Sequence, residues 1–180
     1  MEKLLKIKAP LDGEALCKLK AGDTVKLSGV IYTARDQAHL RMYNMIMKGE
    51  PLPVELKAQI IYYCGPSPRG ERIIGSCGPT TSGRMDAFSP ALMTKGLKGM
   101  IGKGKRSAEV KEAIKKYRAV YFLAPGGAGA YLSERVRSCT AAAFEDLGPE
   151  AVYRLEVEDF PLIVGVDCLG NDIYDRLNAG

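Results

Sequence analysis

The feature that most constrains the fold is an irregular succession of strand-like and helix-like segments along the 180 residues. Residues 24–32 alternate and then become wholly apolar, which predicts a strand, whereas residues 35–48 carry apolar side chains at helical spacing before Gly49. Ser89 and Ser107 are expected to cap the helices that follow them. This order favours an α/β domain with a mixed sheet over a regular doubly wound fold. Further strands are expected at 60–64, 72–75, 99–102, 119–124, 152–157 and 162–166, and further helices at 89–95, from Ser107 and from 126–130.

Length and composition are those of one domain spanning residues 1–180, because 46% of the residues are apolar and 26% are charged. No apolar run approaches the roughly 18–20 residues that a membrane span requires. Residues 1–8 lack the long apolar region and the small-residue cleavage site of a secretion signal. We therefore expect a cytoplasmic protein without a membrane partner.

The five cysteines are scattered widely without a C-x-x-C pair, and His39 is the one histidine. An odd and dispersed set of cysteines predicts neither a disulfide framework nor a self-contained zinc site. A single histidine excludes a multi-histidine metal site. We therefore assign no metal ligand to this chain, and a metal in its chemistry would take most of its ligands from elsewhere.

Residues 80–86, Thr-Thr-Ser-Gly-Arg-Met-Asp, are the most informative polar cluster. Three consecutive hydroxyl side chains followed by glycine and arginine suit the floor of an anion pocket rather than a core. If a helix begins here, its first backbone N–H groups and its dipole add positive potential. Arg84 can then grip a carboxylate with two hydrogen bonds. The alternative is an ordinary helix start, for which one hydroxyl would suffice.

Two further polar clusters stand where an expected strand ends. In the first, Arg35 and His39 are four residues apart and share a helix face, while Asp36 can orient a neighbour. The alternative there is a helix cap with an exposed ion pair. In the second, residues 102–107, Lys103 stands between two glycines, which allow a ligand to approach closely, but the complete phosphate-loop pattern is absent. Together Arg35 and Arg84 suit a substrate with two carboxylates.

Positive charge is concentrated between residues 95 and 118, where there are nine basic residues and two acidic ones. A nucleic acid or a small anionic substrate would account for this charge, as would a solvated helix face. No stripe of aromatic side chains accompanies the lysines, which argues against a nucleic-acid-binding module.

Five short motifs follow one another over nearly the whole chain. They resemble the β subunit of class I, iron–sulfur fumarate hydratase, or the equivalent C-terminal domain of its single-chain members. The L-tartrate dehydratase β subunit shares most of them, and the segment 80–86 is the most specific part. The motifs are Ala-Arg-Asp-x-Ala-His at 34–39, Gly-Pro-Thr-Thr-Ser-Gly-Arg-Met-Asp at 78–86, Gly-Lys-Gly at 102–104, Glu-Asp-Leu-Gly-Pro-Glu-Ala at 145–151 and Glu-Val-Glu-Asp-Phe-Pro at 156–161.

The resemblance implies a swivelling β/β/α-type domain and the reversible hydration of fumarate to L-malate. The close alternative is dehydration of L(+)-tartrate. It also implies a fumarate hydratase α subunit as partner, which holds a [4Fe–4S] cluster on three cysteines and leaves its fourth iron to bind substrate as a Lewis acid. This chain would be inactive alone, and we expect a dimer of αβ units.

The resemblance further implies roles for particular residues. Arg35 and Arg84 match arginines that bind the substrate carboxylates, and Thr80 matches the threonine proposed as the base. No role is assigned to Lys105, because many members of the family have asparagine at its position. The remaining assignments are Lys103 as a second catalytic residue, Thr81 and Ser82 as substrate-binding residues, and Asp36 and His39 as supporting residues.

Overall fold

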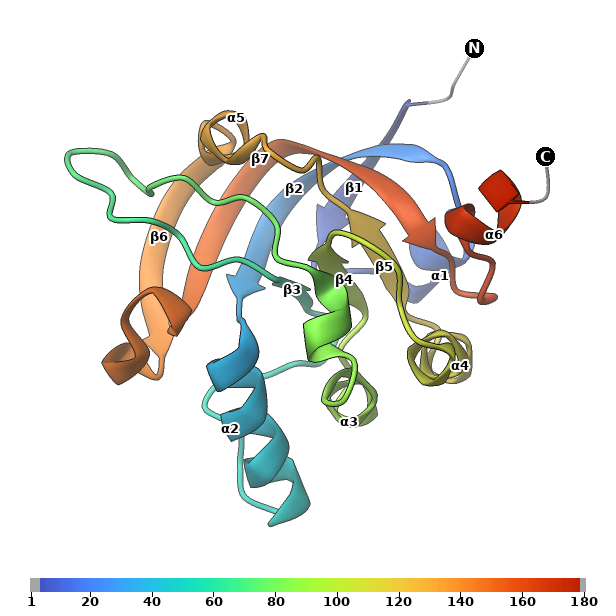
Figure 1. Cartoon of the computed structure of the whole chain (residues 1–180), viewed down its shortest axis with the longest axis horizontal. Helices are drawn as coiled ribbons and strands as arrows, with labels where there is room; N and C mark the ends of the chain where they lie inside the picture. Colours follow the sequence, from blue (N-terminus) through green and yellow to red (C-terminus); the bar gives the residue numbers. More distant parts are fainter. Residues whose placement is uncertain (1–3, 179–180) are drawn as a thin grey trace.

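The computed structural model describes residues 4–178 and contains a mixed, seven-stranded sheet with the spatial order β1-β2-β3-β4-β5-β7-β6 (Figure 1). Neighbours among β1 to β5 are parallel, whereas β7 is antiparallel to β2, β5 and β6. Because β2 pairs with β7 as well as with β3, strands β2, β3, β4, β5 and β7 close into a barrel, to which β1 and β6 are added. The strands are β1 (Leu4–Ala9), β2 (Thr24–Thr33), β3 (Ile60–Tyr62), β4 (Gly99–Gly102), β5 (Val120–Leu123), β6 (Val136–Ala143) and β7 (Val152–Val166).

Helices α2, α3 and α4 pack against the outside of this barrel, while α1 and α5 each add a leucine to the cluster inside it. Helices α2, α3 and α4 lie together on one side of the sheet, along its lower side in Figure 1. Among residues 4–178, no helix has both the length and the apolar character needed to cross a membrane. The helices are α1 (Gly13–Cys17), α2 (Asp36–Met47), α3 (Ser89–Thr94), α4 (Ala108–Tyr117), α5 (Gly129–Ser133) and α6 (Ile173–Asn178), with two 3₁₀ helices, η1 (Ser82–Met85) and η2 (Glu145–Glu150).

The alternation of side chains along β3 divides the core in two. Ile60 and Tyr62 point into the barrel, where Tyr62 packs edge-on against Phe160 of β7. Ile61 and Tyr63 point outward and join the second cluster, which α2, α3 and α4 cover. A strand buried on both faces has no polar side, which explains why 60–64 is wholly apolar.

The α/β class with a mixed sheet is confirmed, while the swivelling β/β/α arrangement remains a prediction. The strands expected at 24–32 and 99–102 and the helix expected at 35–48 are present within a residue or two. Ser107 is the N-cap of α4, where its Oγ accepts a hydrogen bond from the Val110 N–H at 3.3 Å. Of the single domain expected at 1–180, residues 1–3 and 179–180 lie outside the described residues.

Two strand predictions were wrong. Residues 72–75 lie in a loop that closes on itself, since the Ser67 N–H donates to the Ser76 carbonyl at 3.0 Å. The segments 152–157 and 162–166 are one strand, β7, because the chain bulges between them instead of turning. At that bulge Asp159 adopts a φ of 49°, and its N–H donates to Ser28 Oγ at 3.0 Å.

One capping prediction was also wrong, and two strands were not expected. Ser89 is the first residue of α3 rather than its N-cap, and its hydroxyl donates to the Met85 carbonyl at 2.9 Å. Strands β1 and β6 carry lysines, arginine and small residues in place of the apolar runs that mark the other strands. Each pairs through one long neighbour, β1 with β2 and β6 with β7.

Candidate active site

The three polar clusters meet at one edge of the sheet, because β2, β3 and β4 are parallel and their carboxyl ends lie side by side. The site segment, residues 80–86, runs along this edge. The Thr80 N–H donates to the Tyr63 carbonyl at 2.6 Å, just past the end of β3. The Ser82 N–H donates to the Lys103 carbonyl at 2.9 Å, and the Lys103 N–H to the Thr80 carbonyl at 3.3 Å. The structure therefore joins the second and third clusters through backbone hydrogen bonds.

The three hydroxyl residues of the site segment differ in exposure. Thr81 is exposed, Thr80 is half-buried and Ser82 is fully buried. Ser82 fits there because residue 102 is glycine: a Cβ on Gly102 would lie 1.9 Å from Ser82 Oγ. Lys103 is exposed next to it. The expected helix start is a single 3₁₀ turn, η1, whose N-cap Thr81 makes no side-chain capping bond, so the helix dipole contributes little here.

Arg84 already grips a carboxylate in this structure, that of Asp36 at the start of α2. Nε donates to Asp36 Oδ1 at 3.0 Å and Nη2 to Oδ2 at 2.6 Å, which is a two-pronged geometry. The predicted contact of Arg84 with a substrate carboxylate remains a prediction. The hydrogen bonds to Asp36 use Nε and Nη2 of the guanidinium. Asp36, expected as a supporting residue, thus joins the first cluster to the second.

Arg35 lies near the same Asp36 oxygen that Arg84 Nη2 contacts. Its Nε is 3.9 Å from Asp36 Oδ2 and 3.9 Å from Glu150 Oε1, so it is near both carboxylates but has no hydrogen-bond partner among the described residues. The side chain passes close to Gly65, where a Cβ would lie 2.9 Å from Arg35 Nη1. Two guanidinium groups, Arg35 and Arg84, therefore flank one carboxylate at this edge.

His39 lies beneath the two arginines rather than among them. It is completely buried, its Nδ1 lies 2.8 Å from the Arg35 carbonyl oxygen, and its ring packs edge-on against Tyr63 at 5.2 Å between centroids. Burial, with a smaller contribution from the Arg106 charge, lowers the pKa of His39 to about 4, against the opposing effect of the hydrogen bond to Arg35. A neutral imidazole must donate from Nδ1 to this carbonyl, so His39 fixes the start of α2 at neutral pH.

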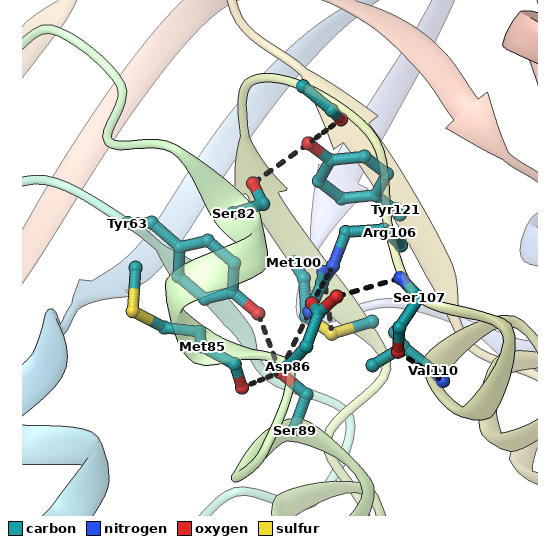
Figure 2. Close-up of polar contacts among 11 residues, drawn as sticks. Tyr63, Ser82, Met85, Asp86, Ser89, Met100, Arg106, Ser107, Val110 and Tyr121 are labelled. Atoms are coloured by element: carbon teal, nitrogen blue, oxygen red, sulfur yellow. Dashed lines mark hydrogen bonds and ion pairs between the residues drawn. The ribbon is translucent and has the colours of Figure 1, made fainter.

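A buried polar network lies under the site segment (Figure 2), and its central residues, Arg106 and Asp86, were given no role from the sequence. At its centre Arg106 Nε donates to Asp86 Oδ1 at 2.7 Å, and Nη2 donates to Ser89 Oγ at 2.8 Å. The guanidinium carbon lies 5.3 Å from the Tyr63 ring centroid and 4.8 Å from that of Tyr121. Burial disfavours its charge, but Tyr63 and Asp86 outweigh this and raise the pKa of Arg106. The available signals were Asp86 within the most specific motif and Arg106 within the polar cluster at residues 102–107.

The basic stretch 95–118 is not a continuous free surface. Arg106 is buried, and Lys98 Nζ donates to the Tyr117 carbonyl. Lys111 Nζ lies 3.3 Å from Asp172 Oδ2 and 3.1 Å from Asp175 Oδ2. Charges neutralised within the chain are less available to phosphate groups, which weakens the nucleic-acid alternative.

Within residues 4–178, no three side chains of histidine, cysteine, aspartate or glutamate lie together in a way that could hold a metal ion. The five cysteines are present as free thiols, and Cys64 and Cys77 are buried in the barrel, where burial raises the pKa of each thiol. The described residues therefore do not fit an iron–sulfur cluster of their own.

Comparison with known proteins places the chain. The model of the family described as Fumarase C-terminus matches residues 2–177. The chain is 42% identical over 168 residues to the putative L(+)-tartrate dehydratase subunit beta of Methanocaldococcus jannaschii, covering 89% of this chain and 86% of that subunit. It is 40% identical over 178 residues to fumarate hydratase 2 of Leishmania major, covering 96% of this chain but 31% of that enzyme.

The aerobic class I fumarate hydratase of Salmonella typhimurium is 36% identical over 169 residues, covering 92% of this chain and 29% of that enzyme. The chain thus spans less than a third of these two fumarate hydratases and most of the tartrate dehydratase subunit. The family expected from the motifs is confirmed, and the chain belongs to the Fumarase C-terminus family.

Proposed function

We propose that this chain is the β subunit of an iron–sulfur hydro-lyase that reversibly hydrates fumarate to L-malate, at a site completed by an α subunit. The observation that carries the proposal is the convergence of Arg35, Arg84, Thr80 and Lys103 at one sheet edge in a member of the fumarase family. Both substrates of this reaction are dicarboxylates. Two guanidinium groups beside a lysine supply the charges that such a substrate needs.

Substrate binding follows from the geometry of the Asp36 carboxylate. Arg84 holds it with two hydrogen bonds, and Arg35 Nε lies 3.9 Å from Oδ2 of the same carboxylate. A substrate carboxylate has the same shape and charge as that of Asp36. We infer that one end of the substrate binds Arg84 and the other lies toward Arg35, with Thr81 at the exposed rim of the site.

Proton transfer is assigned to Thr80, with Lys103 beside it. Dehydration of L-malate removes a proton from the carbon next to a carboxylate, and the carbanion-like intermediate places extra negative charge on that carboxylate. A fixed arginine stabilises this charge more strongly than it stabilises the ground state. A threonine is a weak base, so the positive charges of Lys103 and Arg84 favour its alkoxide.

The [4Fe–4S] cluster implied by the class I resemblance is assigned to the α subunit, because the described residues do not offer its ligands. We propose a cytoplasmic dimer of αβ units in which this chain binds and orients the substrate and moves its proton. Neither a nucleic acid nor a membrane is part of the proposal.

Anaerobic co-expression with a cysteine-bearing α partner tests the proposal. We expect a brown complex that dehydrates L-malate, while this chain alone shows no turnover. Thr80→Ala in the complex should abolish most turnover, and Thr80→Ser, which keeps the hydroxyl, should retain part of it. A complex that forms and carries a cluster but turns over neither malate nor tartrate contradicts the proposal.

L(+)-tartrate dehydratase is the second candidate, favoured by the 86% coverage of the Methanocaldococcus jannaschii subunit. Tartrate is also a dicarboxylate with an acidic carbon next to a carboxylate, so Arg35, Arg84 and Thr80 would take the same roles. The ratio of kcat/KM on L-malate to that on L(+)-tartrate, measured on one preparation of the complex, separates the two candidates.

A further inference from the structure

We propose that Arg106 is a positioning residue, which fixes the site segment against the Lys103 loop, residues 103–107, before substrate binds. This inference deepens the proposed hydro-lyase function and rests on it. Arg106 does not reach the exposed face of the site, because its side chain is fully buried. It would therefore act through the residues that it holds.

The first contact is the ion pair with Asp86, the last residue of the site segment. Arg106 Nε donates to Asp86 Oδ1 at 2.7 Å, and the Ser107 N–H donates to Oδ2 at 2.7 Å. The Asp86 carboxylate thus binds two consecutive residues, Arg106 and Ser107, at the end of the polar cluster 102–107. Since Ser107 is also the N-cap of α4, the site segment, the Lys103 loop and α4 are fastened at one point.

The second contact is Ser89, whose hydroxyl is completely satisfied. It donates its one hydrogen to the Met85 carbonyl at 2.9 Å and accepts from Arg106 Nη2 at 2.8 Å. The Tyr63 hydroxyl, 3.2 Å away, must then donate to the remaining acceptor position of Ser89. Arg106 therefore fixes the C-terminal end of η1 through Asp86 and Ser89, as Figure 2 shows.

The third contact reaches Ser82 through Tyr121, whose ring packs on the Arg106 guanidinium. The Tyr121 hydroxyl lies 2.8 Å from both Ser82 Oγ and the Gly104 carbonyl oxygen. A phenol has one hydrogen and a carbonyl has none, so Tyr121 donates to Gly104 and Ser82 donates to Tyr121. This chain of hydrogen bonds again joins the site segment to the Lys103 loop, and it gives buried Ser82 a positioning role.

The Arg84 backbone lies within η1, but its side chain has a second hold outside this network, the two hydrogen bonds to Asp36. Loosening the Arg106 network should therefore displace Thr80 and Lys103 more than the carboxylate grip. Reactivity depends steeply on such displacement, since a misplacement of about 1 Å can cost about a hundredfold in rate. The expected signature is a fall in kcat with a small change in KM.

The test compares Arg106→Lys with wild type in the assembled αβ complex. Lysine keeps the charge but cannot reach Asp86 and Ser89 together. We expect kcat to fall about ten- to a hundredfold and KM to change less than about threefold. Hydrogen exchange, measured on the full chain alone and in the complex, should accelerate about tenfold in residues 80–86 and 102–107.

Two further variants keep the test decisive if Arg106→Lys folds poorly. Arg106→Met/Asp86→Leu replaces the buried pair with apolar groups, so it should recover stability yet keep the low kcat. Leu16→Ala in the barrel core is the matched control, because it destabilises the chain at a distance and should leave both kcat and local exchange unchanged.

Wild-type kcat or wild-type exchange in both segments of the Arg106→Lys variant would overturn the inference. A fall in kcat in Leu16→Ala equal to that in Arg106→Lys would overturn it too, since general instability would then be the cause. If the wild-type complex lacks hydro-lyase activity, the proposed function fails, whereas the exchange measurement still decides whether Arg106 holds the two segments together.

Discussion

Two arginine–aspartate pairs hold the same short segment of this chain in different surroundings. Arg84 and Asp36 meet at 2.6 Å on the surface, with 49% and 28% of their side chains exposed. Arg106 and Asp86 meet at 2.7 Å beneath it, with 0% and 15% exposed. Arg84 and Asp86 are two residues apart in the sequence, so one segment carries both kinds of ion pair.

The difference between the pairs is how easily each exchanges its partner. Near the surface, water replaces a lost partner, so an exposed pair contributes about 0–1 kcal/mol and a ligand can compete for it. In the interior, removing one partner leaves a charge without water, which costs about 3–5 kcal/mol. The outer pair therefore suits recognition of a carboxylate, and the inner pair suits positioning.

The largest expected effect comes from breaking the inner pair. Asp86→Ala should lower the free energy of unfolding by about 3–5 kcal/mol, because the buried Arg106 loses its counter-charge. Urea unfolding at neutral pH measures this. Asp146→Ala, which breaks the exposed pair with Arg41, is the control and should unfold at the wild-type urea concentration. An Asp86→Ala loss below about 1 kcal/mol would mean that water reaches Arg106.

Burial is the main cause of the low pKa of His39, and both ion pairs also affect it. The Arg106 charge lowers this pKa and the Asp36 charge raises it. Its pKa of about 4 in the folded chain lies below the ordinary 6.5. The neutral form thus stabilises the fold above pH 6.5, and this stability is lost as the pH falls from 6.5 to 4. The loss amounts to about 3 kcal/mol at about 1.4 kcal/mol per pKa unit.

The variant His39→Asn isolates this contribution, because its amide can still donate to the Arg35 carbonyl but does not titrate in this range. Urea unfolding at pH 7 and pH 4 should show a smaller acid-induced loss in His39→Asn than in wild type, by about 3 kcal/mol. Equal losses in the two proteins would show that His39 is not buried as a neutral group.

Breaking the outer pair should affect catalysis before stability. In the αβ complex, Arg84→Lys keeps the charge but loses the two-pronged grip, which costs about 1.5–3 kcal/mol for a charge-assisted hydrogen bond. This corresponds to a decrease of about tenfold to more than a hundredfold in kcat/KM. Arg137→Lys, at the exposed pair with Glu158, is the matched control. Unchanged kinetics in Arg84→Lys would argue against contact with a substrate carboxylate.

The fold was predictable where one element carries its own signal. The helical spacing of apolar residues in α2 and the unbroken apolar run of β3 are each visible within one short stretch of sequence, and both elements were expected. Strand β6 was not, because its exposed and small residues pack through β7, which lies later in the sequence. The bulge at Asp159 was also hidden, since its hydrogen bond to Ser28 joins residues far apart in the chain.

The roles of the site residues remain a prediction. That the polar clusters lie together was predictable from the sequence, whereas the pairings of their side chains were not. Parallel strands bring their carboxyl ends together, so the neighbourhood of Thr80 and Lys103 follows from the order of elements. The partner of Arg84 cannot be inferred from the order of elements, because Asp36 lies 48 residues earlier in the chain. The burial of Arg106 could not be predicted, because it stands among other basic residues and arginine is usually exposed. Only the tertiary packing shows that this arginine is buried.

The smallest expected effect is the coupling within the outer pair. A double-mutant cycle of Arg84→Met and Asp36→Leu, followed by urea unfolding, should give an interaction energy of about 0.2–1 kcal/mol, decreasing as salt is added. The same cycle on Arg106 and Asp86 should give a larger energy that salt hardly changes, because burial excludes the screening ions. An outer coupling above about 2 kcal/mol that resists salt would make Arg84–Asp36 a structural pair. A carboxylate substrate could then not compete for Arg84, and its role in the proposed site would have to pass to Arg35.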